Sequence, residues 1–149
     1  MKIPILMYHS ISSGVSKLAV TEKNFEQQMN FLSNNNYKSI SFDDLDFLDK
    51  RSKYFIITFD DGYENVFKYA LPILKKFNFT STCFFVTNYI GKHNDWDKKN
   101  INFQKQKIMS LEQILIWHKS GMSIGAHTAN HKNLSEIDFE QKKNEILNS

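Results

Sequence analysis

The chain has 149 residues, of which 41% are hydrophobic and 23% charged, and its net charge is +3. This length predicts a single domain, 1–149, and the small net charge with scattered basic residues argues against a nucleic-acid partner. No apolar run approaches the ~20 residues of a transmembrane segment, and no signal-peptide core is visible. We therefore expect a cytoplasmic chain, or one that acts outside the cytoplasm or at a membrane if an export segment is missing.

The first part of the chain alternates short apolar runs with one amphipathic segment. Thr21 is a suitable N-cap, and Phe25, Met29 and Leu32 recur at helical spacing behind it. The predicted elements are a strand at 3–8, a helix from 21 to 34–36, a short strand at 37–41, a helical piece at 43–48 and a strand at 54–59.

The second part continues the alternation of strands and helices. Ser110 and Gln113 form a capping box, and Gly121 supplies a stop for the helix between them. The predicted elements are a helix at 66–77 interrupted at Pro72, a strand at 80–86, a long polar loop at 91–109, a helix at 110–121, a strand at 122–126 and a last helix opened by Ser135 with Asp138. This order predicts an α/β fold with a parallel sheet.

Two adjacent carboxylates, Asp60 and Asp61, follow the predicted strand that ends at Phe59. Asp-Gly is a common turn dipeptide, so a simple turn is one interpretation. The other is a metal or catalytic site at the carboxyl end of a parallel strand, where α/β folds bind ligands. If the chain continued as a strand, the two side chains would point to opposite faces, which favours one metal ligand and one base.

A second polar motif, HTANH at 127–131, follows another predicted strand. Its two histidines, His127 and His131, are four residues apart, a spacing found in zinc sites but also in exposed loops. Because the carboxyl ends of parallel strands lie on one rim, both motifs are expected there. One carboxylate and two imidazoles leave coordination positions open, as in catalytic rather than structural metal sites.

Together the two motifs resemble those of the polysaccharide deacetylases of carbohydrate esterase family four, which carry the nodulation-deacetylase homology domain. TFDDG at 58–62 is similar to the first family motif and HTANH to the second, in the right order and spacing. The opening LMYHSI at 6–11 also resembles the bacterial branch that modifies surface polysaccharides. The resemblance implies a distorted (β/α) barrel, here incomplete, with about five strands.

The resemblance also implies an activity and a role for each site residue. The family removes N-acetyl groups from amino sugars of GlcNAc-type poly- or oligosaccharides, with a metal-bound water as nucleophile and a divalent ion, usually zinc, as cofactor. Asp60 corresponds to the catalytic base. Asp61, His127 and His131 correspond to the metal ligands, and Thr128 would brace the histidine loop by hydrogen bonding.

The sequence departs from the family pattern after His131. The family's third motif, Arg-x-Pro-Tyr, and its fifth, Leu-x-His with the general acid, have no match there, and Arg51 is the only arginine. We therefore expect 1–149 to be a C-terminally truncated domain that lacks a C-terminal portion or a second chain. Alone, it should deacetylate poorly or not at all.

Two other functions fit part of this pattern. A catalytically dead remnant or carbohydrate-binding module would keep the metal triad without the chemistry. A two-histidine, one-carboxylate iron oxygenase has the same donor set, but the TFDDG context argues against it.

Two further residues are candidates for the substrate groove. His9 stands at the end of the first predicted strand, where a structural, hydrogen-bonded histidine is the alternative. Trp96 lies in the long loop, where it would stack on a sugar ring or simply pack within the loop.

Overall fold

The protein is described by a computed structural model that covers residues 2–13, 18–49, 51–99 and 103–149. Within these residues the main element is a five-stranded sheet with parallel pairing throughout. Its strands are β1 (Ile5–Tyr8), β4 (Tyr37–Ser39), β5 (Lys53–Phe59), β6 (Thr82–Phe85) and β7 (Ser123–Ala126). The predicted α/β fold and the predicted number of strands are confirmed, and the sheet forms part of a barrel.

Strand β5 is the centre of the sheet. Strand β1 pairs with Ile56 to Phe59, β4 with Lys53 to Phe55, and β6 with Thr58 and Phe59. Strand β7 pairs with β6 along its whole length. A separate pair of short strands, β2 (Ser10–Ile11) and β3 (Ala19–Val20), was not predicted from the sequence.

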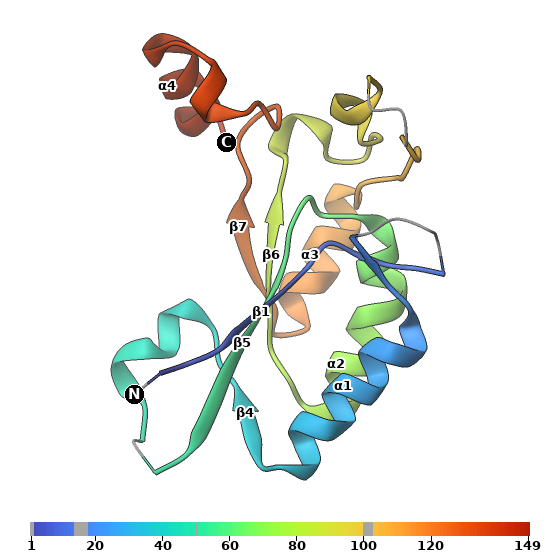
Figure 1. Cartoon of the computed structure of the whole chain (residues 1–149), viewed down its shortest axis with the longest axis vertical. Coiled ribbons are helices and arrows are strands. Elements are labelled where there is room, and N and C mark those ends of the chain that lie inside the picture. The colour runs from blue at the N-terminus through green and yellow to red at the C-terminus, as the bar shows by residue number, and fades with distance from the viewer. Residues whose placement is uncertain (1, 14–17, 50, 100–102) are drawn as a thin grey trace.

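Four α-helices and several shorter helical turns lie between or after the described strands. The α-helices are α1 (Glu22–Asn34), α2 (Leu71–Phe77), α3 (Leu111–Lys119) and α4 (Phe139–Leu147). The shorter turns are η1 (Phe42–Phe47), η2 (Val66–Ala70), η3 (Thr87–Tyr89), η4 (Asp95–Asp97) and η5 (Leu134–Glu136). Figure 1 shows α1, α2 and α3 on one side of the sheet, η1 on the other, and α4 beyond the ends of β6 and β7.

Most of the predicted caps are found where expected. Thr21 accepts a hydrogen bond from the backbone of Asn24, and Ser110 with Gln113 forms the predicted capping box. The predicted start of the last helix is wrong, because Asp138, not Ser135, is the N-cap of α4. Ser135 instead lies in η5, where its N–H and hydroxyl both donate to the side chain of Asn133.

The helix predicted at 66–77 is two elements. The π-helical turn η2 precedes α2, and Pro72 lies in the first turn of α2. The N–H of Leu71 still donates to the carbonyl of Val66 in η2, and Pro72, which has no N–H to donate, lies where the π-helical turn passes into the α-helix. The alternative that Pro72 starts a new turn is therefore the one observed.

Aromatic packing fixes the end of β5 against the helices. The side chain of Phe59 is fully buried. Its ring centroid lies 5.6 Å from that of Tyr8 in β1, 5.8 Å from that of Phe25 in α1 and 5.9 Å from that of Trp117 in α3. Such aromatic contacts stabilise a core beyond the burial of their area. Since Phe59 immediately precedes Asp60, this cluster determines where the two carboxylates leave the sheet.

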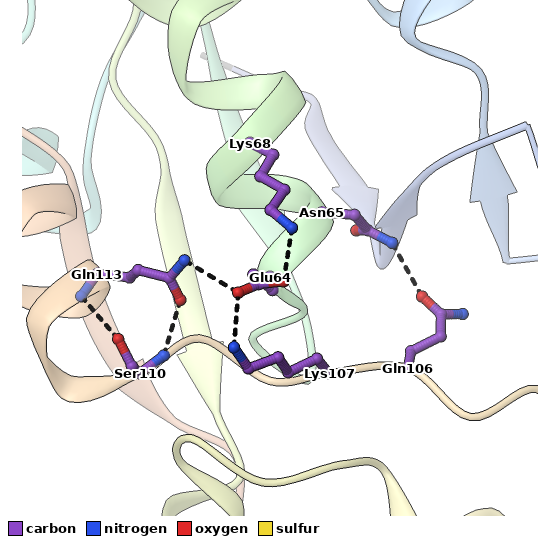
Figure 2. A network of polar contacts seen from close by, with 7 residues as sticks. All are labelled: Glu64, Asn65, Lys68, Gln106, Lys107, Ser110 and Gln113. Carbon is purple, nitrogen blue, oxygen red and sulfur yellow. Dashed lines mark hydrogen bonds and ion pairs between the residues drawn. The ribbon is translucent and has the colours of Figure 1, made fainter.

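A polar network ties the loop before α3 to the start of η2 (Figure 2). Glu64 accepts hydrogen bonds from Lys68 at 2.8 Å, Lys107 at 3.0 Å and Gln113 at 3.1 Å. Its backbone N–H also donates to the carbonyl of Lys107. The hydrogen bond from Lys68 has the largest effect on the pKa of Glu64, and those from Lys107 and Gln113 add to it. Together they lower this pKa to about 2, although burial acts to raise it.

Asn65 extends the network toward the N-terminal strands. Its Nδ2 donates to Gln106 Oε1 at 2.9 Å and to Ser10 Oγ at 2.8 Å, while its Oδ1 accepts from the N–H of Ile11. The loop predicted as irregular is therefore held at residues 106–107 by side chains from two other parts of the chain.

Replacing Glu64 with glutamine should lower the free energy of unfolding at pH 7 by about 1–2 kcal/mol, since two of the three donors are partly exposed lysines. The folded-state pKa of Glu64 is depressed, so its contribution is complete above the unfolded value of ~4.3 and is lost as the pH falls toward 2. Urea unfolding at pH 7 and pH 2.5 measures this. The difference from the wild type should shrink at the lower pH, whereas Glu136→Gln, at an exposed position, should show little difference at either.

No helix among the described residues is both long and apolar enough to cross a membrane.

Candidate metal centre

The chain turns sharply after β5, and this turn directs Asp61 inward. Asp61 has φ +71° and Gly62 has φ +77°, both in the left-handed region. The strand therefore ends at Phe59, and the strand geometry assumed for Asp60 and Asp61 does not apply. The Asp61 side chain is buried, whereas the Asp60 side chain remains 16% exposed.

Only glycine fits at position 62. A Cβ atom there would lie 2.3 Å from Cδ1 of Phe85 in β6, in addition to holding a left-handed φ. The carbonyl of Gly62 also accepts a hydrogen bond from the N–H of Met109. The position of Asp61 thus depends on close packing beneath the turn.

Gly62→Ala should destabilise the fold by about 2–4 kcal/mol, because backbone strain and overpacking each cost about 1–3 kcal/mol. The matched control is Gly121→Ala, since Gly121 has φ +85° but a Cβ there would meet nothing within 4 Å. Urea unfolding of both variants measures the two effects. Equal losses in the two variants would show that the Phe85 contact costs nothing.

The second motif forms a loop after β7 that carries both histidines. The N–H of His127 donates to the carbonyl of Phe85, which anchors the loop to β6. Thr128 Oγ1 accepts a hydrogen bond from the N–H of His131 at 2.9 Å. Thr128 and His131 have φ +61° and +59°, so two non-glycine residues of this loop are left-handed.

Asp61, His127 and His131 come together at the carboxyl ends of β5 and β7. Oδ1 of Asp61 lies 3.1 Å from Nε2 of His131 and 3.6 Å from Nε2 of His127. One candidate ligand atom from each residue lies within 4.8 Å of the other two, the only such cluster among the described residues. Oδ1 is buried and has no aligned hydrogen-bond donor.

This arrangement fits a divalent cation. A buried carboxylate oxygen without a donor is costly unless a positive group completes its environment. Two nitrogen donors and one oxygen donor converge on the same point, a set typical of zinc and related metals. The residues present therefore suit a metal ion.

The electrostatics of the cluster favour one neutral and one more basic histidine. Burial lowers the pKa of His127, although the negative charges of Asp61 and Asp60 act to raise it. Burial would also lower the pKa of His131, but the contact with Asp61 outweighs it and the pKa is raised. The pKa of Asp61 is lowered, because the nearby imidazoles outweigh the effect of its burial.

The remaining candidates lie next to this cluster. Nε2 of His9 is 3.9 Å from Oδ2 of Asp60, which is too long for a hydrogen bond. Trp96 stacks on His131, with ring centroids 4.9 Å apart and an angle of 23° between the rings. Trp96 is thus packed against a candidate ligand, and Tyr89 contacts its ring edge-on at 4.9 Å.

Sequence reasoning did not single out two residues of this region. Tyr63 is buried beside the turn, and burial followed by the charge of Asp61 raises its pKa. Glu145 of α4 is buried against the histidine loop. Tyr63 directly follows TFDDG and Glu145 lies in a polar helix, and neither position in the sequence indicates a contact with the site.

Comparisons with known proteins found relatives among the polysaccharide deacetylases. YxkH of Bacillus subtilis, named as a polysaccharide deacetylase, is 36% identical over 154 residues, covering 99% of this chain and 50% of that protein. The poly-beta-1,6-N-acetyl-D-glucosamine N-deacetylase of Staphylococcus aureus is 26% identical over 136 residues, covering 88% of this chain and 44% of that protein. The chain spans about half the length of these curated relatives.

Solved structures share the fold. The Streptococcus pyogenes deacetylase PplD, solved in complex with acetate, matches with a TM-score of 0.80 and 26% identity, over 100% of this chain and 66% of that chain. The family described as Polysaccharide deacetylase matches residues 48–149, a range that contains both motifs. On this match and on the fold it shares with PplD, the chain belongs to the polysaccharide deacetylase family.

Proposed function

We propose that the chain is part of a metal-dependent hydrolase, and that this hydrolase removes N-acetyl groups from amino sugars of a GlcNAc-type polysaccharide. The observation that carries this proposal is the buried Oδ1 of Asp61, which faces the Nε2 atoms of both His127 and His131. The name of the S. aureus relative supports the N-acetylglucosamine polymer as substrate, and the acetate complex of PplD supports acetate as product.

In this proposal Asp61, His127 and His131 hold a divalent ion, with zinc as the expected metal. Bound there, such an ion lowers the pKa of a water molecule and polarises the amide carbonyl of the substrate. Thr128 keeps the backbone of His131 in place through its hydroxyl.

Asp60 acts as the general base. Its carboxylate is partly exposed beside the metal cluster and is not hydrogen-bonded by His9, so it can accept the proton of the attacking water. The water oxygen bonds to the carbonyl carbon, the carbon–nitrogen bond breaks, and the amine leaves with a proton. His9 and Trp96 are proposed to line the groove that receives the sugar.

The polypeptide that supplies the general acid lies outside these 149 residues in this proposal, on a C-terminal portion or a second chain. The relatives are about twice as long, and β1 exposes Ile5 at 53% and Met7 at 63%. Strands that add to the sheet would cover such side chains and complete the domain.

The experiment is an acetate-release assay on soluble oligomers of β-1,6- and β-1,4-linked GlcNAc, at high protein concentration. We expect slow release that stops with a chelator and returns with added zinc. Glycan binding without any acetate release would favour the alternative, a carbohydrate-binding remnant. The oxygenase hypothesis is set aside, because the chain belongs to the deacetylase family.

A further inference from the structure

The histidine loop needs support from outside its own residues. Thr128 and His131 both hold left-handed backbone conformations, which cost about 1–3 kcal/mol each for non-glycine residues. Such conformations persist only where surrounding contacts over-determine them. The hydrogen bond between these two residues lies within the loop, so it cannot by itself anchor the loop to the fold.

Helix α4 supplies an unusual anchor. Its apolar side chains are largely exposed, with Phe139 at 75% and Leu147 at 70%, whereas Glu145 is only 3% exposed. A helix normally buries its apolar face and exposes its carboxylates. Here the one buried side chain of the helix is a glutamate, and in Figure 1 the helix lies beyond the end of β7, next to the loop.

The Glu145 carboxylate contacts the loop at Asn130. Its Oε2 accepts from the backbone N–H of Asn130 at 2.7 Å, and its Oε1 accepts from Nδ2 of the same residue at 2.8 Å. The carbonyl of Glu145 also accepts from the N–H of Ala129. Three bonds from one helical residue thus hold the two residues that lie between Thr128 and His131.

The opposite side of the loop is held by η3. The N–H of Asn88 donates to the carbonyl of Ala129, and its Nδ2 donates to Oδ1 of Asn130 at 3.0 Å. The Asn130 amide therefore bridges Asn88 on one side and Glu145 on the other. Burial would raise the pKa of Glu145, but the bonds from Asn130 outweigh it and keep the carboxylate ionised.

We propose that Glu145 is a positioning residue, which fixes Asn130 and through it the imidazoles of His127 and His131 in the arrangement that binds the cation. This inference rests on the proposed metal function. Partners of this kind, which orient ligands without touching the metal, change metal affinity about 10–100-fold when they are removed.

The test uses the 149-residue chain with Glu145→Ala and Glu145→Gln. Zinc affinity, measured by competition with a chromogenic chelator, should fall about 10–100-fold in the alanine variant. The glutamine variant, which keeps one acceptor oxygen, should lose less and serves if the alanine variant does not fold. The matched control is Glu140→Gln, an exposed glutamate of the same helix, which should bind zinc as the wild type does.

A double variant tests the route through Asn130. If Glu145 acts through that residue, Asn130→Ala combined with Glu145→Ala should lose no more zinc affinity than the stronger single variant. Additive losses would overturn the route. A purely structural role for Glu145 would lower the unfolding midpoint but leave zinc affinity and the visible spectrum of the cobalt-loaded protein unchanged, and this result would overturn the proposal.

Hydrogen exchange separates this inference from the proposed function. The N–H of His131 bonds to Thr128 and not to Glu145, so its exchange reports the order of the loop itself. It should speed up in Glu145→Ala, and unchanged exchange would refute the positioning role. If the wild type binds no zinc, the proposed function fails, while His131 exchange still decides whether Glu145 orders the loop.

Discussion

Replacing Asp61 with alanine is expected to weaken zinc binding by more than about 100-fold, because removing a ligand should cost more than the 10–100-fold seen for residues behind the ligands. Oδ1 of Asp61 is the atom that both imidazoles approach, so its loss leaves two nitrogens without the third donor. Competition with a chromogenic chelator at pH 7.5 measures the change, and circular dichroism checks that the variant is folded.

Asp46→Ala is a suitable control, because this aspartate is exposed and remote in sequence from both motifs. Its affinity for zinc should match that of the wild type. A second readout is the pH dependence, because protonated imidazoles do not bind metal. The pKa of His131 is raised, so affinity should begin to fall above the ordinary histidine value of ~6.5 and fall further as the pH drops through it. Retention of tight binding by Asp61→Ala would rule out Asp61 as a ligand.

The sequence was sufficient for the fold class because the periodic signals were local. The apolar run that ends at Phe59 shows no alternation, as expected for a parallel strand covered on both faces, and β5 is the central strand. The spacing of Phe25 and Met29 likewise predicted α1, where both side chains are buried. Such patterns depend on neighbours within a few residues.

The details of the candidate site depend on contacts that no local pattern encodes. Strand geometry predicted opposite directions for Asp60 and Asp61, but two successive left-handed residues replace the strand after Phe59. Glycine at 62 hinted at the turn, whereas its fit against Phe85 required the sheet pairing. The burial of Glu145 was equally invisible, since in the sequence it is one more charged residue of a polar helix.

The incorrect start of the last helix has the same origin. Ser135 and Asp138 are both good capping residues, and the sequence alone did not rank them. The side chain of Asn133 accepts hydrogen bonds from both the hydroxyl and the N–H of Ser135. Asp138 accepts from the N–H of Gln141 and caps α4. Competition between neighbouring capping residues is decided by the surrounding fold.

Replacing Asp60 with asparagine is expected to lower acetate release about 10²–10⁴-fold, the usual contribution of a general base. Asparagine has nearly the same shape as aspartate but cannot accept the proton from the attacking water. Zinc affinity should remain close to that of the wild type, because Asp60 is not part of the ligand cluster. The measurements are acetate release from GlcNAc oligomers with saturating zinc and chelator competition on the same preparation.

The contrast with Asp61→Ala makes the two roles distinguishable. That variant should lose both zinc binding and acetate release, whereas Asp60→Asn should lose acetate release alone. If Asp60→Asn weakened zinc binding as strongly as Asp61→Ala, Asp60 would be a ligand and not the base. If instead acetate release were unchanged, another group would have to accept the proton, and His9, with Nε2 at 3.9 Å from Oδ2 of Asp60, is a candidate. His9→Ala in the Asp60→Asn background would then be the variant that stops the reaction.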